Sequence, residues 1–180
     1  MSDLRRAVFL DRDGVLTEAP VVDGHPGSPR LASEMVVFPE AVDACVELER
    51  ARLLRIVVTN QPEIARGGLD PAELEAMNAR LEHELSLDAI IVCPHDDADG
   101  CDCRKPKPGM LLAAADRFGI DLPASFTVGD RWRDIDAGRS AGTHTVFIDR
   151  GYDEALSGEP DATVGGIEEA TRWIIRQIDQ

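Results

Sequence analysis

Short apolar runs alternate with amphipathic helical patterns along this chain, and this alternation restricts the possible folds most strongly. The run at 54–58 is almost continuous Leu, Ile and Val, which is typical of a parallel strand covered on both faces. The alternation predicts an α/β fold with a Rossmann-like, doubly wound parallel sheet. The expected strands, numbered 1 to 5 along the chain, are 6–10, 54–58, 88–93, 125–128 and 144–148.

Helices are expected between the strands, at 39–52, after Asp70, at 108–118, at 132–141 and at 166–178. In the first of them Val42, Cys45, Val46 and Leu48 fall on one face, so Cys45 is interpreted as a core residue. Asp70, followed by proline and then by glutamate three positions on, has the pattern of an N-cap with a capping box. Glycines at 119 and 142 are expected to end two of the helices.

The size and charge of the chain limit its organisation and partners. A length of 180 residues is typical of one domain, expected here over 1–180, and the irregular segments 17–38 and 94–107 are too short for a separate cap domain. The net charge of −15 disfavours binding to nucleic acids and to anionic membranes. Without a signal-peptide pattern or an apolar stretch of about 18 residues, the expected compartment is the cytoplasm. The chain is also expected to be a monomer.

Two aspartates, Asp11 and Asp13, directly follow the first expected strand. In an open α/β sheet, ligands bind at the carboxyl ends of the strands. Carboxylates at this spacing can share a metal ion or divide the roles of nucleophile and acid. The pair taken alone is also compatible with an ordinary surface loop.

Other polar residues follow the neighbouring strands. Thr59, Asn60 and Gln61 follow strand 2, Arg104 and Lys105 lie beyond strand 3, and strand 4 ends in Asp130, with Asp134 one helical turn further on. These residues also have structural explanations that involve no function. Thr59 could be an ordinary strand-end threonine, Arg104 and Lys105 could belong to a solvated basic loop, and Asp130 could be a helix N-cap. Together they fit phosphoryl transfer, in which carboxylates attack, donate a proton and hold Mg²⁺ while a hydroxyl and a lysine bind the phosphoryl group.

These motifs resemble those of the haloacid dehalogenase (HAD) superfamily, in the same order over residues 6–150. The resemblance implies strand order 3-2-1-4-5, with Asp11 as nucleophile and Asp13 as general acid and base. It also implies that Thr59 and Lys105 stabilise the phosphoryl group. Mg²⁺ would be held by Asp11, the backbone carbonyl of Asp13, and Asp130.

A cysteine-rich loop follows strand 3. Three thiols and one imidazole lie within eleven residues, and together they form a closed tetrahedral set for structural zinc. The alternatives are unrelated thiols or a disulfide. The four expected ligands are Cys93, His95, Cys101 and Cys103.

The zinc loop and the segment 104–110 resemble two families of phosphatases, one acting on heptose 1,7-bisphosphates at the 7-phosphate and the other on histidinol phosphate. The segment around Arg66 is closer to the heptose family. The resemblance implies a small phosphorylated sugar as substrate, and substrate contacts from Asn60, Gln61, Arg66, Arg104 and Arg131.

Two segments depart from the heptose family. The region 18–25 lacks the usual His-Gly-Tyr-type sequence, and Pro62-Glu63 stands where a small Ser-Gly pair is common. Both changes fall on expected specificity loops and leave the choice of sugar open. Three alternatives remain: a histidinol-phosphate phosphatase, a nucleic-acid end phosphatase, which the charge disfavours, and an inactive interaction module stabilised by zinc.

Overall fold

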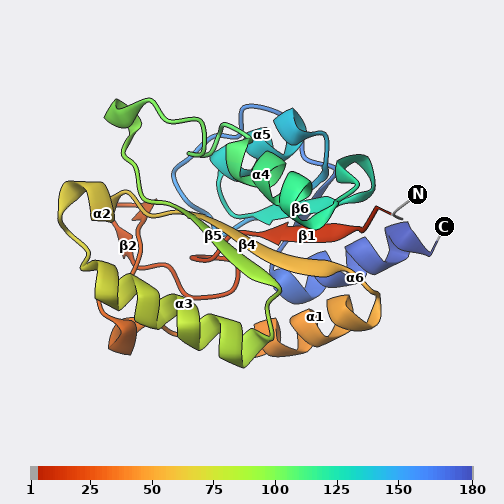
Figure 1. Cartoon of the computed structure of the whole chain (residues 1–180), viewed down its shortest axis with the longest axis horizontal. Coiled ribbons are helices and arrows are strands. Elements are labelled where there is room, and N and C mark those ends of the chain that lie inside the picture. The colour runs from red at the N-terminus through yellow and green to blue at the C-terminus, as the bar shows by residue number, and fades with distance from the viewer. Residues whose placement is uncertain (1–3, 180) are drawn as a thin grey trace.

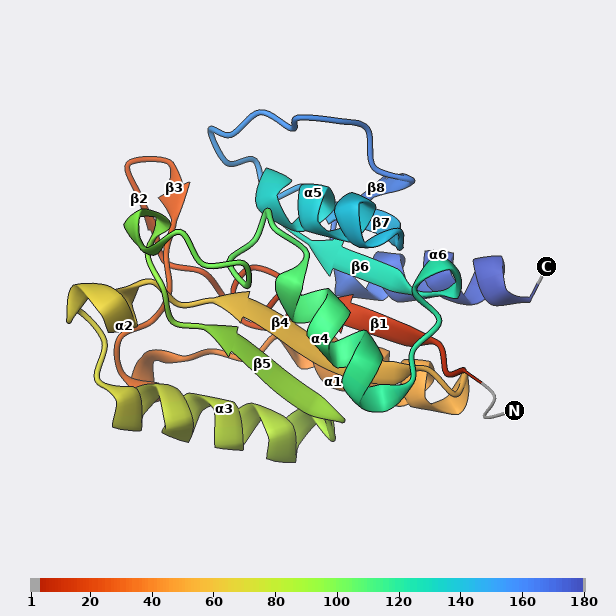
Figure 2. The ribbon, with the colours of Figure 1, turned by 45° about the horizontal axis from the view of Figure 1, so that its top comes forward.

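A parallel six-stranded sheet forms the centre of the molecule. The computed structural model describes residues 4–179, and the strand order is β5-β4-β1-β6-β7-β8. The five expected strands occupy adjacent positions in the order 3-2-1-4-5, and β8 extends the sheet beyond β7 (Figure 2). The sheet strands are β1 (Ala7–Leu10), β4 (Leu54–Asn60), β5 (Ala89–Cys93), β6 (Phe126–Gly129), β7 (His144–Ile148) and β8 (Ala162–Val164).

Helices cover both faces of the sheet, as expected for a doubly wound fold (Figures 1 and 2). One face carries α1 (Pro39–Arg50), α3 (Pro71–Leu85) and α6 (Ile167–Ile178). The other face carries α4 (Gly109–Phe118) and α5 (Trp132–Ala141).

Side chains of β1 alternate between the two layers of the core. Val8 and Leu10 pack in the layer with α1, α3 and α6, whereas Ala7 and Phe9 pack in the layer with α4. All four are fully buried, which explains why the strand is a continuous apolar run. The nucleophile candidate that follows β1 is therefore fixed by the most enclosed strand of the sheet.

The apolar face of α1 is rotated from the expected one. Cys45 and Leu48 are buried as predicted, but Val42 and Val46 are exposed, and Ala41 and Ala44 pack inward instead. The prediction for these two valines was wrong because the small alanines allow α1 to lie close to α6 and β4.

The start of α3 is only partly as expected. Asp70 caps the helix, its carboxylate accepting a hydrogen bond from Ala72 N at 2.8 Å, and Pro71 is the first helical residue. Within the part of the chain that the structure describes, α3 does not begin with the predicted capping box. The Glu73 carboxylate accepts a hydrogen bond from Ala32 N at 2.6 Å instead. Glu73 thus ties the segment 17–38 to α3.

Several short elements lie outside the sequence prediction. They include a two-stranded hairpin within segment 17–38 and a short helix after β4, both next to the site described below. These elements are β2 (Val21–Val22), β3 (His25–Pro26), η1 (Ala32–Glu34), α2 (Glu63–Arg66), η2 (Asp97–Asp99) and η3 (Leu122–Ala124).

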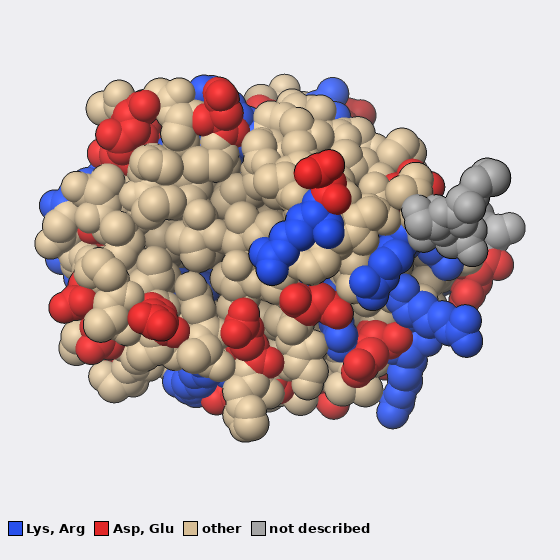
Figure 3. All heavy atoms as spheres, viewed as in Figure 1, with Lys and Arg blue, Asp and Glu red and all other residues tan. Residues whose placement is uncertain are grey.

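The surface shown in Figure 3 carries scattered acidic side chains, and its largest group of Lys and Arg lies beside the two chain termini. Within residues 4–179, none of the helices has the length and apolar character needed to cross a membrane.

Candidate active site

A cavity of about 300 Å³ opens at the carboxyl ends of β1 and β4. Its floor contains Asp11, Asp13, Thr59 and Lys105, so it brings together the four residues predicted to be catalytic. The walls are formed by segment 17–38, the start of α2, the cysteine-rich loop after β5 and the start of α5. The other lining residues are Pro26, Gly27, Ser28, Asn60, Pro62, Glu63, Arg66, Asp97, Arg104, Arg131, Arg133 and Asp134.

At this floor Lys105 is buried between two carboxylates. Its ammonium donates to Asp11 Oδ1 at 2.7 Å, to Asp134 Oδ1 at 2.5 Å and to the backbone oxygen of Val58 at 2.6 Å. Burial opposes its charge, but Asp11 and Asp134 prevail and raise the pKa of Lys105. For Asp11, burial raises the pKa to about 6 although Lys105 acts in the opposite direction. One ammonium thus offsets only part of the local negative charge.

A third buried carboxylate, Asp130, completes a candidate site for a divalent cation. One oxygen from each of Asp11, Asp130 and Asp134 lies within 4.8 Å of the others. Both Asp130 oxygens are buried and have no well-formed hydrogen bond within the described part of the chain. Burial, Asp11 and Asp134 raise the pKa of Asp130 well above its usual range. A hard cation such as Mg²⁺ prefers such oxygen ligands and would supply the missing partner.

Gly14 and Tyr152 enclose Asp130 from the other side. Gly14 has φ of +86°, and a Cβ placed on it would collide with the Asp130 carboxylate and reach the Tyr152 hydroxyl at 3.0 Å. The Gly14 carbonyl accepts a hydrogen bond from Arg150 Nε at 2.8 Å. Glycine is therefore required here both by backbone conformation and by the close approach of a carboxylate.

Asp13 is held by an unusually dense set of donors. Arg12 is fully buried and binds it through two nitrogens, Nε to Oδ1 at 3.1 Å and Nη2 to Oδ2 at 2.9 Å. Thr17, Ser28 and Gln61 donate to the same carboxylate at 3.1, 2.7 and 3.0 Å. These contacts fix the Asp13 carboxylate beside the cavity without using the carboxylates of the candidate cation site.

The three residues after the β4 run have different environments. Thr59 is buried at the cavity floor and its hydroxyl accepts a hydrogen bond from Gln61 Nε2 at 3.0 Å. Gln61 is fully buried and is not part of the cavity lining, so it touches Thr59 and Asp13 rather than the space for a ligand. Asn60 borders the cavity, but its amide engages the main chain of Lys105 at both ends, at 3.0 and 3.1 Å.

The three arginines predicted to bind substrate all line the cavity, and each is paired with a carboxylate. Arg66 contacts Asp96 at 2.6 Å, Arg104 contacts Asp97 at 2.8 Å, and Arg131 pairs with Glu154. The structure adds a fourth arginine, Arg133 from α5, which was not predicted to bind substrate. The cavity therefore has local cations although the chain as a whole is strongly acidic.

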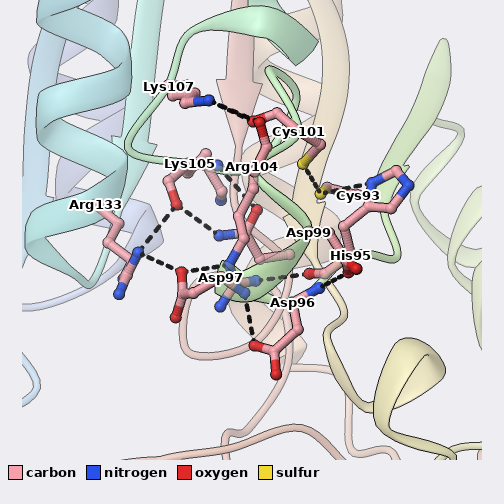
Figure 4. Close-up of polar contacts among 12 residues, drawn as sticks. Cys93, His95, Asp96, Asp97, Asp99, Cys101, Arg104, Lys105, Lys107 and Arg133 are labelled. Carbon is pink, nitrogen blue, oxygen red and sulfur yellow. Dashed lines mark hydrogen bonds and ion pairs between the residues drawn. The ribbon is translucent and has the colours of Figure 1, made fainter.

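The four predicted zinc ligands converge in a single cluster, and Figure 4 shows three of them, Cys93, His95 and Cys101. Cys103 Sγ lies 3.2 Å from Cys93 Sγ, 3.4 Å from Cys101 Sγ and 3.3 Å from His95 Nδ1. A tetrahedral zinc with Zn–S bonds of about 2.3 Å has sulfur–sulfur edges of roughly 3.8 Å, close to these separations. All three are free thiols, so the disulfide alternative does not apply. Burial raises the pKa of Cys93 to about 12, and zinc would hold this thiol as thiolate.

Sequence reasoning missed several residues that shape the site. Arginine at position 12 gave no signal because charged side chains are normally exposed. Tyr152 and Glu154 lie between β7 and β8, in a segment without the apolar pattern of a strand or helix that could have linked it to the site. Ser28 lies in segment 17–38, which the sequence identified only as a specificity loop. Arg133 lies between Asp130 and Asp134 in the sequence, and this position could have indicated a fourth arginine at the cavity.

Comparison with known proteins agrees with this fold and site. The HAD-hydrolase-like family matches residues 102–170. A curated protein of Pseudomonas aeruginosa is 38% identical over 161 residues, covering 87% of this chain and 88% of the relative. The chain therefore belongs to the HAD-like hydrolases.

The relatives are named more specifically. The P. aeruginosa protein is a D-glycero-beta-D-manno-heptose-1,7-bisphosphate 7-phosphatase, and the protein of that name from Escherichia coli K12 is 34% identical over 96% of this chain and 89% of its own length. The crystal structure of D,D-heptose 1,7-bisphosphate phosphatase from Bordetella bronchiseptica, complexed with magnesium and phosphate, superposes with a TM-score of 0.82. It is 30% identical, over 96% of this chain and 99% of that one.

Proposed function

We propose that this chain is a Mg²⁺-dependent phosphatase that removes the 7-phosphate of D-glycero-D-manno-heptose 1,7-bisphosphate through an aspartyl-phosphate. The observation that carries the proposal is the buried group of Asp11, Lys105 and Asp134 in a cavity rimmed by arginines, with Asp130 directly behind it. The names of the relatives at 33–38% identity support the same substrate.

In the proposed reaction the Asp11 carboxylate attacks the phosphorus atom and the bond to the sugar oxygen breaks. Asp13 gives its proton to the departing oxygen, which leaves as the sugar hydroxyl. A water molecule then attacks the aspartyl-phosphate while Asp13 takes the proton of that water. Inorganic phosphate is released and the Asp11 carboxylate is restored.

The surrounding residues would stabilise charge on the transferring group. We assign Thr59 and Lys105, which line the cavity with Asp11, to contacts with phosphoryl oxygens. Mg²⁺, held by Asp11, the Asp13 carbonyl and Asp130 with Asp134 close by, would neutralise phosphate charge when bound. We assign Gln61 and Asn60 to positioning, since their amides engage Asp13, Thr59 and Lys105.

The remaining proposals concern the loop and the assembly. Zinc bound by the three cysteines and His95 would be structural, because four protein ligands leave no open position. It would hold Arg104 and Lys105 at the cavity, where Arg66, Arg131 and Arg133 also face the sugar bisphosphate. We further propose that the chain is a single-domain, cytoplasmic monomer.

The test is a comparison of kcat/KM for the α and β anomers of heptose 1,7-bisphosphate and for histidinol phosphate. A higher kcat/KM for at least one heptose anomer than for histidinol phosphate is expected. Asp11→Asn should lower kcat by at least about 10³-fold, whereas Asp116→Asn, on the exposed side of α4, should not. Higher kcat/KM for histidinol phosphate would favour that family, and phosphate release equal in wild type and Asp11→Asn would support the inactive module.

A further inference from the structure

One carboxylate, that of Asp97, lies between two guanidinium groups at the rim of the cavity (Figure 4). Its Oδ1 accepts hydrogen bonds from Arg104 Nε at 2.8 Å and from Arg133 Nη1 at 3.3 Å. All three residues line the cavity whose floor contains Asp11. An anion of the protein therefore occupies the position between two cations that face the ligand space.

The two arginines are more firmly placed than the carboxylate between them. The side chains of Arg104 and Arg133 are 11% and 25% exposed, whereas that of Asp97 is 58% exposed. Each guanidinium also has a second anchor: Arg104 donates to the His95 carbonyl at 3.3 Å and Arg133 to the Lys105 carbonyl at 3.4 Å. The cations would thus keep their positions if the exposed carboxylate moved away.

We propose that Asp97 is a specificity-determining residue, a resident carboxylate that the second phosphate of a sugar bisphosphate displaces from Arg104 and Arg133. This inference rests on the proposed function. A phosphate offers more oxygen acceptors and more charge than a carboxylate, so it forms stronger charge-assisted hydrogen bonds with two guanidiniums. A substrate with a single phosphate, bound at Asp11, has no group to displace Asp97. The Asp97 carboxylate thereby keeps Arg104 and Arg133 from binding weakly charged ligands.

Removing the charge should therefore strengthen the binding of bisphosphates. Asp97→Asn is expected to lower KM for heptose 1,7-bisphosphate by about two- to fivefold, the range in which partly exposed ion pairs act. The value of kcat/KM for p-nitrophenyl phosphate should change less than KM for the bisphosphate. Asp102→Asn is the matched control, since it removes the same charge from the same loop where Asp102 pairs with Lys107 outside the cavity.

Equilibrium binding separates this inference from the proposed function. Heptose 1,7-bisphosphate and fructose 1,6-bisphosphate are titrated calorimetrically into Asp11→Asn and into Asp11→Asn/Asp97→Asn, which requires no turnover. Tighter binding of either sugar to the double variant supports the role of Asp97. Equal or weaker binding of both overturns it and leaves Asp97 as a support for the arginines. Lack of turnover of heptose bisphosphate by the wild-type protein overturns only the proposed substrate.

Discussion

The ammonium of Lys105 lies 2.7 Å from the carboxylate of Asp11, although 94 residues separate them in the sequence. Asp11 follows the central strand, and Lys105 comes from the loop that carries the candidate zinc ligands. The same ammonium contacts Asp134 at 2.5 Å, so it links the ends of β1, the zinc loop and α5. Stability and catalysis are thus expected to depend on one side chain.

Replacing this lysine should reduce both properties. Lys105→Met leaves Asp11 and Asp134 buried without their cation, and the free energy of unfolding should fall by about 3 kcal/mol, as when a buried ion pair loses one partner. Denaturant unfolding measures this change. Lys107→Met, on the same loop but half exposed, should cost no more than about 0.5 kcal/mol. Equal effects of the two variants would contradict a special role for Lys105.

Arg12 should determine how well Asp13 acts as an acid. Arg12→Lys replaces a two-point contact with a single flexible ammonium, which leaves the Asp13 carboxylate less firmly oriented. We expect turnover of sugar phosphates to fall about tenfold, with a smaller loss for p-nitrophenyl phosphate, whose leaving group needs no proton. The measurement is the ratio of kcat/KM values for the two esters. An unchanged ratio, with both values reduced together, would indicate a purely structural contribution from Arg12.

Gly14 provides a specific test of the cation site. Gly14→Ala places a methyl group against Asp130 and should weaken Mg²⁺ binding at least tenfold, measured by titration calorimetry. Gly67→Ala is the matched control, because Gly67 also has a positive φ, +71°, but nothing lies within 4 Å of an added Cβ. Both variants should lose about 1–2 kcal/mol of stability from backbone strain. Weakened Mg²⁺ binding in Gly67→Ala as well would show that strain, and not the contact with Asp130, is responsible.

Zinc should be present at about one equivalent per chain by elemental analysis. Cys101→Ser should lose it, and kcat/KM for the bisphosphate should fall because Arg104 and Lys105 are no longer held at the cavity. Mg²⁺ affinity should change little, since the carboxylates come from other elements. Cys45→Ala, which alters a thiol in the core, should retain zinc. Native protein without zinc would refute the assignment.

The strands and the main residues of the cavity could be predicted because their signals are local. A continuous apolar run identifies a strand buried on both faces, and the polar residues that follow four such runs must meet at one edge of a parallel sheet. Asp11, Thr59, Lys105 and Asp134 accordingly line one cavity, with Asp130 directly behind it.

Features that depend on tertiary packing could not be predicted in this way. The strand β8 has only three residues and is too short to stand out from a loop. Glu73 has the position of a capping residue, yet a backbone amide 41 residues away binds its carboxylate instead. Arg12 resembles any surface arginine in the sequence, and only the fold reveals that it is fully buried against Asp13.

The central position of β1 has a consequence for synthesis of the protein on the ribosome. β1 is made first, but it is hydrogen-bonded to β4 on one side and to β6 on the other, and Ala7 N donates to Ser125 Oγ across 118 residues. One edge of the emerging strand therefore stays open until about two thirds of the chain has been translated. Contacts this distant in sequence slow folding and leave a strand edge exposed to wrong partners. The segment that places the proposed nucleophile thus needs protection while the rest of the sheet is being made.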